Sequence, residues 1–320
     1  MALPATLFFP VVRLRFEAVV ESPFFLPQYA GSALRGVFGH ALRRLACMTK
    51  QPTCDGCSLR KTCPYAAIFE SLPPSQEGRL ERVREAPKPY VIEPPLGQRV
   101  WQEGETLSFH LVLMGDALRQ LPLLVFAWKQ ALARGVGPAE KCGKGRLLRV
   151  WQTDLPEGEV CVFDAEAEGE VLPCVPMVLP PTPAGVTAYQ LSFYSPLRIQ
   201  QNGCALSNHR LSVEHLLRAL FRRQWLLARC YGEGRDEDMA LLPSLLPLVA
   251  GVTESRRLVW HDWQRFSNRQ QRKMVLGGLL GRWELVGDLS EVWPLLWYGQ
   301  FLHVGKEAVF GCGGYRLTQG

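Results

Sequence analysis

Apolar and polar residues alternate in several stretches of this chain, which predicts strands, while other stretches repeat apolar residues at helical spacing. The first strand is expected over Val11 to Val20, where every second residue is apolar. A helix follows, with Ser32 as its expected N-cap. Its inward face is formed by Leu34, Val37, Phe38, Ala41, Leu42 and Leu45, and its polar face carries Arg35, His40, Arg43 and Arg44. Two glycines inside this helix, Gly36 and Gly39, favour a close contact with another segment.

The order of elements occurs twice along the chain. In the first half, the strand and helix described above are followed by strands at 106–114 and 147–151 and a helix at 121–134. In the second half, strands are expected at 189–194, 260–267 and 276–285 and helices at 211–231 and 293–301. Each half therefore reads β-α-β-(β)-α-loop-β, which is the split βαβ order of the ferredoxin-like fold. The expected fold class is α+β, with two tandem ferredoxin-like (RRM-like) domains. Sheets of this kind commonly bind single-stranded or hairpin RNA.

Proline density predicts the boundary between the two domains. Five prolines fall between 173 and 183, and clusters of proline interrupt regular structure. We expect an N-terminal domain over 1–155, a proline-rich linker over 156–185 and a C-terminal domain over 186–320.

Two glycine-rich loops support a duplication. Glycines at 137, 143 and 145 recur at 305, 311 and 313, at one constant interval. Dense glycines permit positive φ and can bring backbone N–H groups close to a phosphate, although a tight turn without a ligand has the same composition. Only the second loop carries His303 and Lys306, because the corresponding positions of the first loop are Gly135 and Pro138.

Composition indicates a folded protein with a mild positive charge. The 320 residues are 47% hydrophobic and carry a formal net charge of +6, and no apolar run reaches the roughly 18 residues that span a bilayer. Arginines gather at 43–44, 218–229 and 256–273, which suits a polyanionic partner, while a solvated helix face explains any single cluster equally well.

Four of the ten cysteines lie close together, at Cys47, Cys54, Cys57 and Cys63. The central Cys-x-x-Cys pair encloses Asp55-Gly56, a turn suited to a tetrahedral zinc site. We expect a structural zinc in an insertion at about 47–66, with an iron–sulfur cluster or unliganded or disulfide-bonded cysteines as alternatives. Four sulfur ligands leave no open position, which argues against a zinc-dependent enzyme. The scattered remaining cysteines indicate a reducing cytoplasm.

Several separate stretches together resemble one known family. They are Gly31 to His40, Cys54 to Cys57 with Cys63 to Ala66, Trp263 to Gln270, Leu276 to Gly281, and His303 to Lys306 with Phe310 to Gly313. In this order they resemble the CRISPR-associated endoribonucleases of the RAMP superfamily, which cut precursor CRISPR RNA within its repeats. The resemblance runs from the first helix to the C-terminus.

The resemblance implies two ferredoxin-like domains that form a basic cleft, with the C-terminal glycine loop against the RNA backbone. It also implies metal-independent cleavage, in which a 2′-hydroxyl attacks the adjacent phosphate and leaves a 2′,3′-cyclic phosphate and a 5′-hydroxyl. The expected partners are CRISPR repeat RNA and other Cas subunits of an effector complex, with no membrane. A non-cleaving RNA-binding RAMP subunit is the alternative, because it has the same folds and glycine loop.

The candidate site residues follow from these patterns. The catalytic candidates are His40, Tyr29 and His303. For His303 and Lys306 the pattern favours phosphate binding or transition-state support, with His303 as the acid or base the alternative. An ordinary surface histidine is the alternative for His40. The RNA-binding candidates are Arg35, Arg43, Arg44, Arg218, Arg222, Arg265, Arg269, Arg272, Lys273, Gly305, Lys306, Gly311 and Gly313. His110, inside an expected strand, is assigned a structural role.

Overall fold

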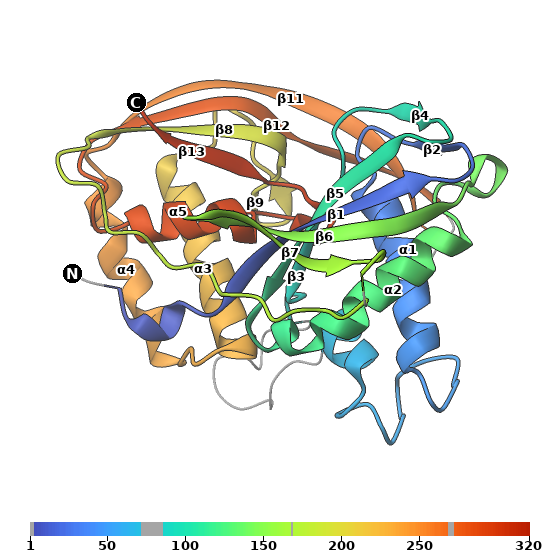
Figure 1. The fold of residues 1–320 in the computed structure, drawn as a ribbon. Coiled ribbons are helices and arrows are strands. Elements are labelled where there is room, and N and C mark those ends of the chain that lie inside the picture. Colours follow the sequence, from blue (N-terminus) through green and yellow to red (C-terminus); the bar gives the residue numbers. More distant parts are fainter. Residues whose placement is uncertain (1–2, 72–85, 168, 268–271) are drawn as a thin grey trace. The chain divides into compact units, whose positions relative to one another are not determined.

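A computed structural model describes residues 3–71, 86–167, 169–267 and 272–320, with only the backbone for 264–267 and 272–276 and for residue 139. The chain forms two compact units (Figure 1). The N-terminal unit comprises Phe9–Met177 with Cys230–Gly232, and the C-terminal unit comprises Met1–Phe8, Val178–Arg229 and Glu233–Gly320. Each unit is described by itself.

The N-terminal unit is built on a five-stranded antiparallel sheet with the order β3-β5-β1-β6-β7. Its strands are β1 (Val11–Val20), β3 (Tyr90–Glu93), β5 (Thr106–Met114), β6 (Gly145–Leu155) and β7 (Gly158–Asp164), and its helices are α1 (Gly31–Ala46) and α2 (Leu121–Arg134). A small β2 (Phe24–Leu26) and β4 (Arg99–Trp101) pair separately. The order of β3, β5, β1 and β6 is that of a ferredoxin-like fold, as the sequence predicted.

Helices α1 and α2 cover one face of this sheet (Figure 1). That face is aromatic: Phe16 and Phe109 stack at 5.2 Å between ring centroids, and Trp128 of α2 lies 4.9 Å from Phe38 of α1. All four rings are buried. Because side chains alternate across a strand, the residues between them, such as Arg15 and Glu17, lie on the face without helices.

The C-terminal unit repeats the arrangement with the sheet order β11-β12-β8-β13. Its strands are β8 (Ala188–Leu197), β11 (Thr253–Ser267), β12 (Arg272–Val286) and β13 (Tyr315–Gln319), its helices are α3 (Val213–Tyr231), α4 (Leu242–Leu245) and α5 (Trp293–Leu302), and a short β9 (Gln200–Gln201) pairs with β10 (Cys204–Ala205). Phe193, Trp283 and Tyr315 are buried on the helix-covered face. The Tyr315 hydroxyl donates to the Leu296 carbonyl of α5.

Short helical turns connect these elements. They span Ala5–Leu7, Ala66–Glu70 (η2, a π-helical turn), Gly115–Gln120, Ala139–Lys141, Glu237–Leu241, Pro247–Val249 and Ala308–Phe310. Within the described part of the chain, none of the helices combines the length and apolarity needed to cross a membrane.

The duplication is visible in atomic detail where each glycine loop meets the first strand of its unit. The Ser22 hydroxyl accepts the Lys144 amide at 2.9 Å, and the Ser195 hydroxyl accepts the Gly314 amide at 2.7 Å. Three residues beyond each serine a carbonyl faces a glycine of the loop, Gly137 in one unit and Gly305 in the other. The repeated pattern therefore belongs to the fold of each unit.

Two sequence-based boundaries need correction. The strand β7 lies inside the expected linker 156–185, because its residues pair with β6 through a tight turn and bury Val162 and Phe163 against the sheet. Helix α1 begins at Gly31 rather than after Ser32. Ala30 occupies the N-cap in a helical conformation, and no side chain caps the helix there.

Candidate functional site

The polar face of α1 presents its histidine to solvent. His40 and Arg44 are exposed and one helical turn apart, so both side chains lie on the same face. Gly36, one turn before His40, leaves open space where a side chain would stand. A ligand can therefore approach the helix backbone beside His40, with a cation one turn away.

The neighbouring arginines of α1 are engaged inside the N-terminal unit. The Arg35 guanidinium lies 4.0 Å from the Phe69 ring centroid and donates to the Tyr90 hydroxyl at 3.3 Å. Arg43 donates to the carbonyls of Gln51 and Pro52. Both residues, expected to bind RNA, hold η2 and the cysteine insertion against α1, which leaves Arg44 as the exposed arginine beside His40.

Gly39 explains why the helix carries a second glycine. A side chain at position 39 would overlap the ring of Phe69 in η2, and that ring also stacks with Tyr65 at 5.3 Å. The close contact expected from the glycines is therefore found at Gly39 and is absent at Gly36 among the described neighbours.

Tyr29 lies half-buried in the turn that leads into α1. Eleven positions separate it from His40, which corresponds to roughly 16 Å along a helix axis. Only a ligand that extends over the first turns of α1 would contact both residues.

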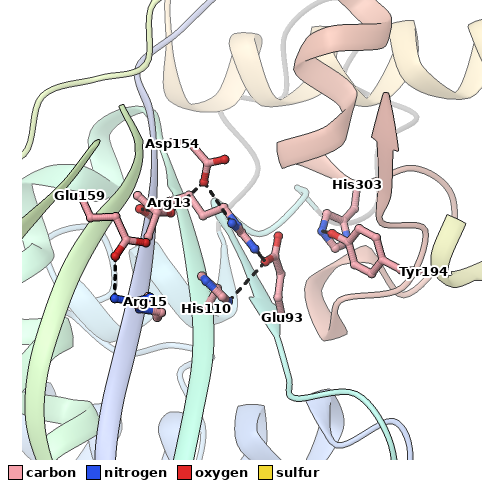
Figure 2. A network of polar contacts seen from close by, with 9 residues as sticks. Arg13, Arg15, Glu93, His110, Asp154, Glu159, Tyr194 and His303 are labelled. Atoms are coloured by element: carbon pink, nitrogen blue, oxygen red, sulfur yellow. Dashed lines mark hydrogen bonds and ion pairs between the residues drawn. The ribbon is translucent and has the colours of Figure 1, made fainter. Parts of the chain in front are cut away.

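His303 is fully buried, contrary to the expectation of a residue in contact with RNA. It ends α5 with a left-handed φ of 58°. Its Nδ1 lies 3.1 Å from the Cys312 carbonyl oxygen and its Nε2 lies 3.3 Å from the Tyr194 hydroxyl oxygen (Figure 2). Because one ring nitrogen has its partner in the loop and the other has its partner on β8, we assign His303 to the packing of the loop against β8.

Backbone amides of the glycine loop after α5 donate hydrogen bonds to carbonyls within the C-terminal unit. The amide of Gly313 donates to Pro196, that of Val304 to Gly313 and that of Lys306 to Arg198. Gly311 and Gly313 are buried, so we assign them to close packing of the backbone rather than to RNA contact. Gly305 is half-buried and Lys306 is exposed, and these two stay candidates for RNA binding.

The remaining RNA-binding candidates lie on α3 and on the β11–β12 hairpin. Arg218 and Arg222 are exposed on α3, and Arg218 is 3.6 Å from Glu214. The side chains of Arg265, Arg272 and Lys273, and all of Arg269, lie outside the described residues.

The four clustered cysteines line one cavity of about 140 Å³. All four are free thiols in this structure. Burial raises the pKa of Cys47, but hydrogen bonds from Lys50 and Thr49 and the Arg43 charge outweigh it and lower the pKa overall. In the described ranges no three ligating side chains are close enough to hold a metal ion as they stand.

A buried charged network on the helix-free face of the N-terminal sheet was not found from the sequence. Arg13 donates to Glu93 at 2.6 Å and to Asp154 at 3.0 Å (Figure 2). The Nδ1 of His110 lies 3.9 Å from the same Glu93 carboxylate. Burial, followed by the charge of Arg13, lowers the pKa of His110 to about 4. The alternation of apolar and polar residues along β1 identified this polar face. Only the pairing of the strands shows that Arg13, Glu93, His110 and Asp154 lie next to one another.

The depressed pKa of His110 predicts an acid-sensitive N-terminal unit. Between pH 6.5 and about 4 the unfolded chain binds a proton at His110 that the folded unit does not. Stability therefore falls as pH falls through this window, by up to about 1.4 kcal/mol per pH unit from this group. Urea unfolding of the wild type and His110→Gln at pH 7 and pH 5 measures the difference. An equal pH dependence in both proteins would contradict the assignment.

Comparisons with known proteins agree with this architecture. Residues 191–315 match the family model described as the CRISPR-associated endoribonuclease Cas6, and residues 8–174 match a model described as an N-terminal domain. An uncharacterised protein of Archaeoglobus fulgidus is 28% identical over 312 residues, which cover 95% of this chain and 96% of that protein.

Solved structures share the fold at low sequence identity. A Cas6 product complex has a TM-score of 0.56 at 18% identity, covering 96% of this chain and all of that chain. Thermus thermophilus Cas6 has a TM-score of 0.50 at 16% identity, covering 97% and 99%. A partial Cas6-RT-Cas1–Cas2 complex has a TM-score of 0.59 at 14% identity; this chain is covered completely but spans only 47% of that larger chain.

Two ferredoxin-like units in tandem, each with a glycine loop before its last strand, are the fold that this chain shares with the solved Cas6 structures. The match of residues 191–315 to the Cas6 model, together with this shared fold, supports the CRISPR-associated endoribonuclease that the sequence resembles.

Proposed function

We propose that this protein cuts CRISPR repeat RNA to produce guide RNAs, without a catalytic metal. The observation that carries the proposal is the exposed His40 on α1, with Arg44 one turn away and open space at Gly36. The match of residues 191–315 to an endoribonuclease family model supports it. Histidine is the side chain best suited to proton transfer near neutral pH.

The proposed reaction is an internal transesterification of the RNA strand. The 2′-oxygen at the cut site forms a bond to the adjacent phosphorus while the bond from phosphorus to the 5′-oxygen breaks. His40 accepts the proton from the 2′-hydroxyl, and water delivers a proton to the leaving 5′-oxygen. Tyr29, roughly 16 Å from His40 along the axis of α1, is proposed to contact the RNA strand beside the cut rather than to transfer this proton. Arg44 stabilises the charge that develops on the phosphorane. The products are a 2′,3′-cyclic phosphate and a 5′-hydroxyl.

The partners proposed are the repeat RNA and other Cas proteins. A Cas6 of the same fold was solved as a product complex, and a chain of the same fold was solved in a partial Cas6-RT-Cas1–Cas2 complex. The ten free cysteines fit a reducing cytoplasm as the place of action.

Cleavage of labelled repeat RNA in the presence of EDTA tests the proposal. We expect a product that ends in a 2′,3′-cyclic phosphate, and no cleavage when the nucleotide 5′ to the cut carries a 2′-deoxy sugar, because the nucleophile is then missing. Tight binding of every repeat RNA with no cleavage by the wild type would favour the non-cleaving RNA-binding subunit instead.

We further propose that Cys47, Cys54, Cys57 and Cys63 bind a structural zinc ion. Support comes from four free thiols around one cavity and from the turn in which the Cys57 amide donates to the Cys54 carbonyl, an arrangement typical of a zinc knuckle. The thiols would have to rotate inward to complete the site. The ion would fix the insertion that packs on α1 through η2.

Metal analysis tests the zinc site directly. We expect about one zinc per purified chain, and its loss when Cys54 and Cys57 are both replaced by serine, because two of four ligands disappear. The double variant Cys142→Ser/Cys204→Ser is the matched control, since both cysteines are exposed and outside the cluster. Bound iron with absorbance in the visible range would indicate an iron–sulfur cluster. A wild-type protein purified without any metal would contradict both the zinc site and the iron–sulfur cluster.

A further inference from the structure

Three exposed arginines form one cross-strand row on the C-terminal sheet. Arg257 of β11 lies directly opposite Arg282 of β12. Ser192 of β8 lies opposite both Arg282 and Arg316 of β13. Neighbouring strands are about 4.8 Å apart, so the row crosses all four strands. We call Arg257, Arg282 and Arg316 the arginine row.

The arginine row lies on the face away from α3 and α5. The residues beside it in the same strands, Phe193, Trp283 and Tyr315, are buried on the helix-covered face. Side chains alternate between faces along a strand. The three arginines are accordingly exposed, and a ligand can reach them without unfolding any element of this unit.

The positive charge of the row is not neutralised within the described residues. No ion pair joins a carboxylate to any of its three arginines there, although Glu284 stands two residues beyond Arg282 on the same face. The contact found for Arg316 is with the Tyr194 ring, 5.8 Å from its centroid. Like charges directly opposite each other destabilise an antiparallel pair, and a bound polyanion would remove this cost.

The N-terminal sheet shows the opposite charge pattern on the equivalent face. Its arginines are paired there, Arg13 with Glu93 and Asp154 and Arg15 with Glu159 (Figure 2). Arg15 also pairs with Glu17, and Arg149 pairs with Asp164. Two sheets of the same fold thus differ in one respect. The first neutralises its arginines internally, while the second leaves a row of them open to a ligand.

We propose that the arginine row binds the phosphate backbone of a single RNA strand that flanks the repeat segment to be cut. This proposal rests on the proposed function for the identity of the polyanion. Guanidinium groups bind phosphates in a fixed, bidentate geometry and position a strand without reading its sequence. The ring of Tyr194 beside Arg316 adds an aromatic surface of the kind that single-stranded RNA uses for stacking.

The test compares two RNAs and two triple variants. Both RNAs carry a 2′-deoxy sugar at the cut site, and only one has a single-stranded flank. Arg257→Gln/Arg282→Gln/Arg316→Gln removes the row. Arg119→Gln/Lys129→Gln/Arg134→Gln removes three exposed charges from the N-terminal unit and serves as the control. Affinities are measured by fluorescence anisotropy over a range of salt concentrations.

For the row variant we expect about 10-fold weaker binding of the flanked RNA, and a slope of log K against log salt that is smaller by about 2, since each lost phosphate contact on a single strand removes about 0.7. The unflanked RNA should bind within twofold of wild type. Equal affinity and slope in the row and control variants would overturn the proposal, as would an equal loss for both RNAs. The variant Arg257→Lys/Arg282→Lys/Arg316→Lys, which keeps the charge, should recover most of the salt slope.

Failure of this proposal is distinguishable from failure of the proposed function, because binding is measured without cleavage. A wild-type protein that does not cut unmodified repeat RNA refutes the proposed function. The comparison of flanked and unflanked RNA still tests whether the arginine row binds the flanking strand. A wild type that cuts, with a row variant that binds like the control, refutes the row alone.

Discussion

Replacing His40 by alanine is expected to slow the cleavage of repeat RNA by about 10²- to 10⁴-fold under single-turnover conditions, the usual contribution of one general acid or base. The side chain is exposed on α1, so its removal leaves no cavity in the core. Folding and RNA binding should therefore persist. The expected signature is a large fall in rate with an affinity for 2′-deoxy repeat RNA within about threefold of wild type.

The matched control for this prediction is His209→Ala, which removes another exposed histidine in the C-terminal unit and should leave the rate within about twofold. His303→Gln separates the two histidines considered from the sequence. Since His303 is buried between Cys312 and Tyr194, its replacement should lower the melting temperature. A wild-type rate for His40→Ala, together with a rate loss in a His303→Gln protein of unchanged stability, would transfer the catalytic role to His303.

Gly313→Ala is expected to destabilise the C-terminal unit by about 3 kcal/mol or more. The residue has a left-handed φ of 70°, which costs an L-amino acid about 1–2 kcal/mol. In addition, a Cβ at this position would overlap the carbonyl of Val304, so the loop would have to open and lose the hydrogen bonds that join Gly313 to Val304 and Pro196.

Urea unfolding, followed by the tryptophans of the C-terminal unit, measures this loss. Gly203→Ala is the matched control, because Gly203 also has a positive φ of 80° but open space around its Cβ position. It should cost only the conformational part, about 1 kcal/mol. Similar losses in both variants would show that the loop near Gly313 tolerates a side chain. A Gly313→Ala variant that keeps its stability but binds RNA more weakly would instead indicate that Gly313 contacts RNA.

The regular elements were predictable because their signals are local. The apolar face of α1, the strand β1 and the apolar helix α5 all follow from residues within one element. The strand β7 was missed for the same reason, since the proline-rich segment after it dominates the composition of 156–185. Its identity as a strand depends on pairing with β6, which no local pattern records.

The site was predictable to a smaller extent. His40 was expected on the polar face of α1, where the structure leaves it exposed, and its catalytic role stays a prediction. Arg35 and Arg43 were expected to bind RNA, yet Arg35 is bound to Phe69 and Tyr90, and Arg43 holds the loop at Gln51 and Pro52. Their partners lie in segments whose position relative to α1 exists only after folding.

The sequence by itself determined the duplicated order of strands and helices, the four clustered cysteines and the histidine of α1, because these depend on spacing along the chain. Only the tertiary structure decided what the glycine loop does. Hydrogen bonds to Pro196 and Arg198 and contacts with Tyr194 bury most of it, so its glycines permit close packing. Strand pairing likewise decided which arginines are neutralised and which remain exposed, since opposite partners in a sheet are distant in sequence.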